Sequence, residues 1–369
     1  MSAPDIITAA RGREVGRAPS TARTAVAASR RRDRTRLTIA LCGLVMLLLA
    51  ALATRVLLGG YTVTVADFVR ILRGTVIPGA SYIVLESKLP RALTAGCAGA
   101  ALGAAGALFR RTLRNPLASP DVLGVTQGAA AAAVGALLVT GGRGTALIFA
   151  ALAGGLAATA AVLGLSGADA RLRAAGGVAG SAGGQRLIVA GIAVAALCQC
   201  VVAGAMLQMN EHDLPAAAVW LAGSLSAVTW PQFTVLAIAL VPLLPVAGVL
   251  HARLAPADLG GELAHGLGAH PSRTGTAALL VGSVLAAAAT AVVGPLAFVA
   301  LLATPLARGL AGGRPSLPAA ALTGAVIVVL ADFLGGEAFG SSRLPAGVLT
   351  GACGAPLMLW LLIRSRRHA

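Results

Sequence analysis

Two long apolar runs without a charged side chain constrain this chain more than any other feature. They cover residues 37–54 and 188–210. A helix needs about 20 apolar residues to cross roughly 30 Å of hydrocarbon, so each run is close to or above that length. Hydrophobic residues make up 57% of the chain and charged residues only 11%, a balance far more apolar than that of soluble domains. The sequence therefore predicts an integral membrane protein.

Apolar runs between charged or Pro/Gly-rich breaks predict an all-α, polytopic bundle of about ten transmembrane helices. Residues 37–365 form the predicted transmembrane domain, and residues 1–36, which lack a periodic apolar face, form a disordered basic tail. The predicted spans are 37–58, 91–110, 121–140, 143–165, 187–208, 230–250, 273–292, 295–311, 318–334 and 345–363.

The arginines indicate how the bundle is oriented. They cluster in the tail and in every second loop, which by the positive-inside rule places both termini on the cytoplasmic side of the cell membrane. The basic residues that then fall in outer loops are Arg55, Arg70, Arg73, Lys88, Arg91, Arg143 and Arg343. The formal charge of +16 does not indicate nucleic-acid binding, because aromatic residues total only 3% and the arginines lie between apolar runs.

Polar residues of the kinds that make metal and catalytic sites are sparse. Cys42, Cys97, Cys198, Cys200 and Cys353 all lie in apolar runs, where they pack as small residues. His251, His265 and His270 are not spaced like the ligands of a metal site. No HExxH, GxSxG or paired aspartates occur in a span, so we expect no catalytic site, no metal and no cofactor.

Two other features concern the spans themselves. Gly99 and Gly103, with Gly106 nearby, have the GxxxG spacing of closely packed transmembrane helices. Asp332 is an ionisable residue near the outer end of a span, where helix capping and gating are equally reasonable roles.

Several motifs together carry a family resemblance. Lys88-Leu89-Pro90-Arg91 precedes a glycine-rich helix, and Arg114-Asn115-Pro116-Leu117-Ala118 follows it. Further stretches lie at residues 220–225, 258–268, 294–301 and 344–348. In this order they resemble the FecCD permeases of siderophore, haem and cobalamin importers over about residues 85–365. The chain departs from that pattern at Leu306, where relatives usually carry a histidine, and at Arg343, where they carry a glutamate.

The resemblance implies an inverted-repeat bundle that acts as the membrane subunit of an ATP-driven ABC importer. Its partners would be a second copy or a homologous permease, two ATP-binding-cassette ATPase subunits and an extracytoplasmic substrate-binding protein. ATP would be bound by the partner, because the chain has no GxxxxGK[ST] phosphate loop. The implied cargo is a ferric siderophore, with cobalamin or haem as alternatives. An ion-coupled secondary transporter is a further alternative, but it would be expected to carry mid-span carboxylates.

The resemblance also implies three sets of functional residues. An inner loop would couple the permease to the ATPase, and in it Leu259, Leu263 and Leu267 are spaced four residues apart, as on one face of a short helix that a partner's groove can hold. A solvated connecting helix is the alternative. The coupling set is Asp258, Leu259, Gly261, Glu262, Leu263, Leu267 and Gly268.

The second set would dock the binding protein at the outer surface and consists of Lys88, Arg91 and Arg343. The alternative for these three cations is anchoring at the lipid headgroups. The third set is Asn115 and Pro116, a structural turn, because an Asn-Pro pair fixes an extended backbone and starts the next helix.

Overall fold

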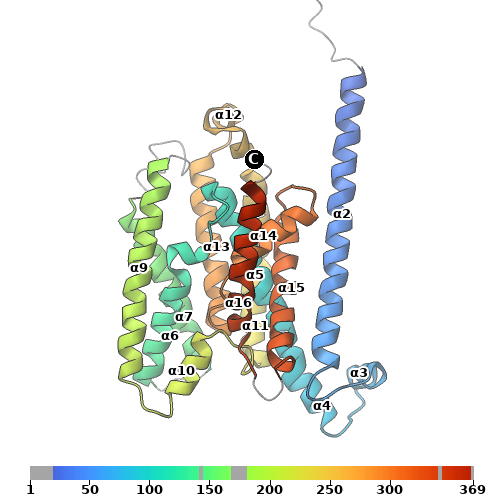
Figure 1. Ribbon diagram of the computed structural model, residues 1–369, viewed down its shortest axis with the longest axis vertical. Coiled ribbons are helices and arrows are strands. Elements are labelled where there is room, and N and C mark those ends of the chain that lie inside the picture. Colours follow the sequence, from blue (N-terminus) through green and yellow to red (C-terminus); the bar gives the residue numbers. More distant parts are fainter. Residues whose placement is uncertain (1–19, 141–143, 168–180, 340–342, 367–369) are drawn as a thin grey trace, which may run out of the picture.

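The computed structural model describes residues 20–140, 144–167, 181–339 and 343–366, and every regular element in these ranges is helical (Figure 1). The all-α class is therefore confirmed. Ten described helices of twelve residues or more correspond to the ten predicted spans. They are α2 (Ser20–Leu57), α5 (Leu89–Leu113), α6 (Val125–Thr140), α7 (Thr145–Leu165), α9 (Ser181–Leu207), α11 (Trp230–Arg253), α13 (Pro271–Val293), α14 (Val299–Leu310), α15 (Leu317–Glu337) and α16 (Ala346–Arg366).

Seven helices in the described ranges are long and apolar enough to cross a membrane. Helices α6, α14 and α16, whose apolar stretches are shorter, complete the bundle. The chain is thus a multi-pass membrane protein, as its composition predicts.

Short helices mark the two ends of the bundle. They are α3 (Val65–Leu72), α4 (Ala80–Tyr82), the π-helix η1 (Ile83–Lys88), the 3-10 helices η2 (Pro120–Leu123) and η3 (Ala255–Leu259), α10 (Leu214–Leu221) and α12 (Gly261–Gly266). In Figure 1, α12 lies at the top, and α3, α4 and α10 lie at the bottom. We call these the α12 end and the α3 end.

Helix α5 is the centre of the bundle and packs against α11, α13, α14 and α15. Glycines in α5 allow this close packing. A Cβ added to Gly99 would overlap the carbonyl oxygen of Gly324 in α15, and one added to Gly103 would overlap that of Ala320. Gly106 meets the carbonyl of Ala300 in α14 in the same way. The backbones are therefore in direct contact, as the GxxxG spacing predicts.

Helix α2 differs from its prediction at the N-terminal end. It begins at Ser20, so residues 20–36 of the segment expected to be disordered are helical in the structure. Arginine and alanine, which dominate this stretch, are good helix formers. Asp33 also forms a 2.6 Å ion pair with Arg314, which follows α14. Figure 1 shows the N-terminal part of α2 extending beyond the bundle at the α12 end.

Helix α14 begins at Val299, four residues later than the predicted span 295–311. The residues before it are irregular, because Gly294 has φ 74° and Phe298 has φ 63°. Phe298 is one of only two non-glycine residues with positive φ in the described ranges, the other being Arg114. Such backbone does not continue a helix, so the apolar run is divided into a turn and a short helix.

Candidate functional site

The predicted coupling segment protrudes at the α12 end and exposes its leucines. Leu259, Leu263 and Leu267 are 61%, 64% and 67% exposed, whereas Ala264 between them is fully buried. The leucines do not share one helix, which corrects the sequence-based expectation. Gly260, with φ 105° and ψ 156°, ends η3, and α12 starts after it. The segment is therefore a compact knuckle with three separate apolar points.

The remaining coupling residues lie in the same knuckle. Gly268 has φ 74° and follows α12. Gly261 and Glu262 form the first turn of α12, and the Glu262 side chain lies outside the part of the molecule that the structure describes.

Two arginines from the end of α5 hold the knuckle against the bundle. Arg111 makes a 2.6 Å ion pair with Asp258 and donates a 2.8 Å hydrogen bond to the carbonyl of His251. Arg114 donates to the carbonyl of Ala257. Asp258 is thus bonded within the chain, and the knuckle is connected directly to the central helix of the bundle.

The Asn-Pro turn follows immediately after these arginines. Arg114 takes a left-handed conformation, with φ 48° and ψ 31°, and ends α5. The side-chain oxygen of Asn115 then accepts a 2.9 Å hydrogen bond from the amide of Leu117, and its carbonyl accepts one from Ala118. This is an Asx turn, which fixes the chain direction before η2 and α6.

A basic cavity separates the turn from the end of α14. Its volume is about 480 Å³, and Arg110, Arg111, Arg114 and Arg308 are among its lining residues, together with Asn115 and Asp258. The turn and the knuckle, which the sequence separates by more than a hundred residues, are therefore brought to one place.

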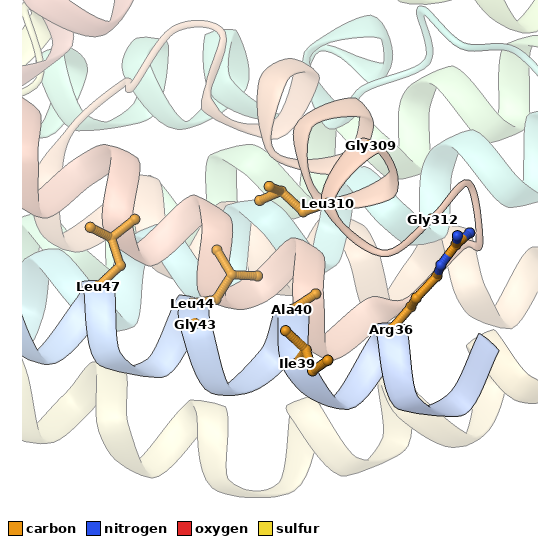
Figure 2. A pocket seen from close by; sticks show the side chains of 9 residues that line it. All are labelled: Arg36, Ile39, Ala40, Gly43, Leu44, Leu47, Gly309, Leu310 and Gly312. Carbon is orange, nitrogen blue, oxygen red and sulfur yellow. The ribbon is translucent and has the colours of Figure 1, made fainter. Parts of the chain in front are cut away.

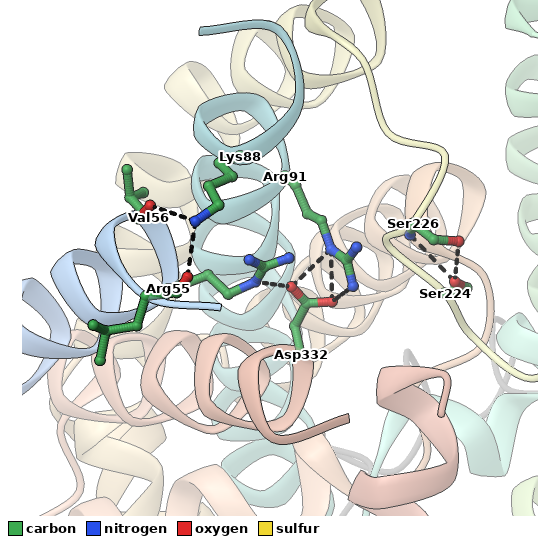
Figure 3. Close-up of polar contacts among 8 residues, drawn as sticks. Arg55, Val56, Lys88, Arg91, Ser224, Ser226 and Asp332 are labelled. Carbon is green, nitrogen blue, oxygen red and sulfur yellow. Dashed lines mark hydrogen bonds and ion pairs between the residues drawn. The ribbon is translucent and has the colours of Figure 1, made fainter. Parts of the chain in front are cut away.

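The α3 end contains a buried ion cluster that sequence reasoning missed in part. Asp332 is 1% exposed, and its carboxylate accepts hydrogen bonds from Arg55 Nε at 2.6 Å and from Arg91 Nη2 at 2.7 Å (Figure 3). Arg55 was expected only as an outer-loop cation. A lone carboxylate inside an apolar run is the signal that would have indicated a nearby cation, because such a charge must be paired.

Lys88 lies beside this cluster and is 7% exposed. Its ammonium group donates to the carbonyls of Val56, Leu58 and Tyr61 at 3.0, 2.9 and 2.6 Å. Figure 3 shows it reaching from the start of α5 to the end of α2. Lys88 therefore caps the carbonyl of Val56 at the end of α2 and also binds two carbonyls of the segment that follows the helix.

The three predicted docking residues are thus in different environments. Lys88 is buried, the Arg91 side chain is only 17% exposed, and both have partners within the chain. The burial of Lys88 and Arg91 argues against a docking role for these two residues. Arg343 is exposed at the α3 end, and so are Arg70 and Arg73 near the end of α3, which the sequence did not single out. Arg143 lies outside the described residues.

Three further motif segments meet at a tight junction. The amide of Gly347 donates a 2.9 Å hydrogen bond to the carbonyl of Gly223. A Cβ on Gly223 would overlap the carbonyl of Pro295, and one on Gly294 would overlap that of Trp220. Close by in sequence, the hydroxyls of Ser224 and Ser226 are 2.8 Å apart (Figure 3). The turns preceding α11 and α14 and the first turn of α16 therefore pack backbone to backbone.

Comparison with known proteins places this arrangement in a family. The Fe(3+)-citrate import system permease protein YfmE of Bacillus subtilis (strain 168) is 37% identical over 286 residues, which is 76% of this chain and 82% of that protein. The ferric enterobactin transport system permease protein FepG of Escherichia coli (strain K12) is 33% identical over 313 residues, 84% of this chain and 91% of that protein.

A solved structure is similar over the same region. A metal-chelate type ABC transporter in an inward-facing conformation matches with a TM-score of 0.76 and 25% identity, covering 88% of this chain and 98% of that one. A sequence model of the FecCD transport family matches residues 45–364. The chain therefore belongs to the FecCD transport family.

Proposed function

We propose that the chain is the membrane permease subunit of an ATP-driven importer that takes up a ferric siderophore. The observation that carries this proposal is the match over most of the chain to two permeases named for ferric chelates. The fold supports it, because the similar solved structure is a metal-chelate type ABC transporter.

The α12 end would receive the energy for transport. Three exposed leucines on a knuckle that is anchored to α5 form an apolar projection suited to a groove on a partner protein. We assign that partner as an ATP-binding-cassette ATPase. Because Arg111 and Arg114 connect the knuckle to α5, a displacement of the knuckle would be passed to the central helix.

The α3 end would receive cargo from a substrate-binding protein. Its exposed cations, Arg70, Arg73 and Arg343, could pair with acidic side chains of that protein. Arg70 is only loosely engaged, because its contact with Asp67 is 3.6 Å long and its side chain is 67% exposed. The proposed docking surface does not include Lys88 and Arg91, because both side chains are bonded within the chain.

The assembly would contain a second copy of this permease or a homologous one, two ATPase subunits and one binding protein. The chain would lie in the cell membrane with both termini, and with the α12 end, in the cytoplasm, as the distribution of arginines favours. Alternating access would follow when the two permeases rock about a shared pathway.

Reconstitution in liposomes tests this proposal. The permease, its candidate ATPase and its candidate binding protein are combined, and uptake of ferric enterobactin, ferric citrate and cyanocobalamin is measured with ATP inside. We expect ATP-dependent uptake of a ferric chelate and faster ATP hydrolysis when the loaded binding protein is added. Uptake of cyanocobalamin alone would contradict the proposed ferric-siderophore cargo. Uptake driven by an ion gradient without ATP would contradict the proposed ATP-driven mechanism.

A further inference from the structure

An apolar groove runs along α2 at the α12 end of the bundle. Figure 2 shows its wall on α2 and, facing it, residues from the end of α14. Its volume is about 570 Å³. The lining residues are Arg36, Ile39, Ala40, Gly43, Leu44, Leu47, Gly309, Leu310 and Gly312.

The groove is open because of two glycines. A Cβ added to Gly43 on α2, or to Gly309 on α14, would meet no atom within 4 Å. The surrounding large side chains are partly uncovered, with Ile39 66% and Leu310 58% exposed. A hollow lined by aliphatic groups is therefore available to an apolar occupant from outside the chain.

A single unpaired charge stands at one end of this groove. Arg36 lies beside Gly312, because a Cβ on Gly312 would be 3.4 Å from Cδ of Arg36. Among the described residues, its guanidinium has no hydrogen bond or ion pair. Its charged neighbours, Asp33 and Arg314, neutralise each other in a 2.6 Å ion pair. The end of the groove therefore has a net positive charge.

We propose that this groove binds an anionic phospholipid, with one acyl chain along α2 and the phosphate on Arg36. Residues 39–47 extend over eight helical steps, which is about 12 Å of apolar wall and suits much of an acyl chain. Arg36 stands where the charge-free run of α2 begins, so it lies at the level of the lipid headgroups. Basic pockets between transmembrane helices bind phosphate-bearing headgroups in this way.

A protein segment fits the groove less well. Arg36 and the apolar wall follow each other along the membrane-spanning direction of α2. The headgroup and the acyl chain of a lipid follow each other in the same order. A lipid with no net charge would fill the apolar wall equally well but would gain less from Arg36. We therefore assign an anionic headgroup, such as that of phosphatidylglycerol.

The test measures retained lipid by native mass spectrometry of the purified full-length permease, with phosphatidylglycerol or phosphatidylcholine added. Gly43→Leu places a side chain in the groove at a position where a Cβ meets no atom within 4 Å, and Gly309→Leu does the same from the opposite wall. Arg36→Gln removes the charge. Gly135→Leu in α6, which also points into open space, and Arg34→Gln, which is exposed on α2 but lies two residues from Arg36 and so on another face, are the matched controls.

We expect Gly43→Leu and Gly309→Leu to abolish the retained lipid. Arg36→Gln should lower the preference for phosphatidylglycerol over phosphatidylcholine about fivefold, which corresponds to about 1 kcal/mol per arginine near a charged surface. Both controls should behave as the unmodified protein. Each variant is compared only if its circular dichroism spectrum is unchanged.

Three results would overturn the proposal. Lipid retention that survives both glycine variants would mean that the groove is not the site. An unchanged lipid preference in Arg36→Gln would remove the anionic headgroup. Finally, the melting temperature of the permease is measured with phosphatidylglycerol or with inorganic phosphate alone. If both raise it equally, and both need Arg36, the ligand would be a free anion.

Discussion

Arg55 and Asp332, which are 277 positions apart in the chain, meet with 2.6 Å between Nε and Oδ2, and both are almost fully buried. Arg91 binds the other side of the same carboxylate. One anion therefore compensates two cations and ties α2, α5 and α15 together. Removing that anion leaves two buried positive charges without a partner.

We expect Asp332→Asn to lower the free energy of unfolding by about 3 kcal/mol or more, the usual cost of breaking a buried ion pair. The measurement is denaturant-induced unfolding of the purified permease in detergent. Asp67→Asn is the matched control, because its pair with Arg70 is exposed and should contribute less than about 1 kcal/mol. Equal stability of the two variants would show that the cluster is not needed.

A second prediction concerns the contact between α5 and α15. Gly99→Ala places a methyl group on the backbone of Gly324, so we expect it to cost about 1–3 kcal/mol or to prevent folding. Gly96→Ala, one turn away in open space, should be neutral or stabilising by up to about 1 kcal/mol, because alanine favours helix. Thermal melting of both variants decides, and a stable Gly99→Ala protein would contradict the packing.

A third prediction tests the knuckle. Leu263→Asp combined with Leu267→Asp should abolish transport and release the ATPase in pull-down assays. Both side chains are more than 60% exposed, so the melting temperature should not change. Val76→Asp, which is 80% exposed at the α3 end, serves as the control and should retain ATPase binding. Full uptake in the double variant would refute the coupling role.

The Asn115 turn gives a fourth prediction. Asn115→Ala removes the acceptor for the amide of Leu117 and should cost about 1 kcal/mol. The larger change, Asn115→Ala with Pro116→Ala, should also lower the yield of folded permease. Asn115→Asp retains an acceptor oxygen and should restore most of the stability in the same thermal melt. The turn would be unimportant if the double variant folded and transported normally.

A fifth prediction concerns docking of the binding protein at the α3 end. Charge reversal of Arg73 and Arg343 to Glu should slow association of the binding protein and flatten its salt dependence, because exposed charges act chiefly on the association rate and are screened beyond about 8–10 Å. Stopped-flow or surface-plasmon measurements at two salt concentrations suffice. Arg253→Glu, which is exposed near the α12 end, should have no effect. Unchanged rates in the double reversal would leave these arginines as lipid anchors.

Sequence reasoning predicted the helices well because each needs an apolar run, and such runs are visible without knowing the neighbours. All ten predicted spans have a counterpart, and Gly99 and Gly103 pack as their spacing indicates. The knuckle differed because Gly260 interrupts the spacing of Leu259 and Leu263 with a backbone conformation that a helix does not contain.

The buried cations could not be predicted from their own neighbourhoods. Lys88 and Arg91 stand beside a proline at the end of a span, which is also where headgroup anchors occur. Their partners are distant in the chain. Lys88 binds carbonyls at the end of α2 and just after it, and Arg91 binds Asp332. Only contact information distinguishes an outer-surface cation from one that is bonded inside.

The ion cluster also has a consequence for biosynthesis. The ribosome makes Arg91 first and Asp332 241 positions later. At roughly 5–20 residues per second, that interval is about 12–48 s. For most of it, α2 and α5 are complete but carry arginines whose counter-charge does not yet exist. We therefore expect α2 and α5, although among the first helices to be translated, to reach full stability in the membrane only after α15 has been made.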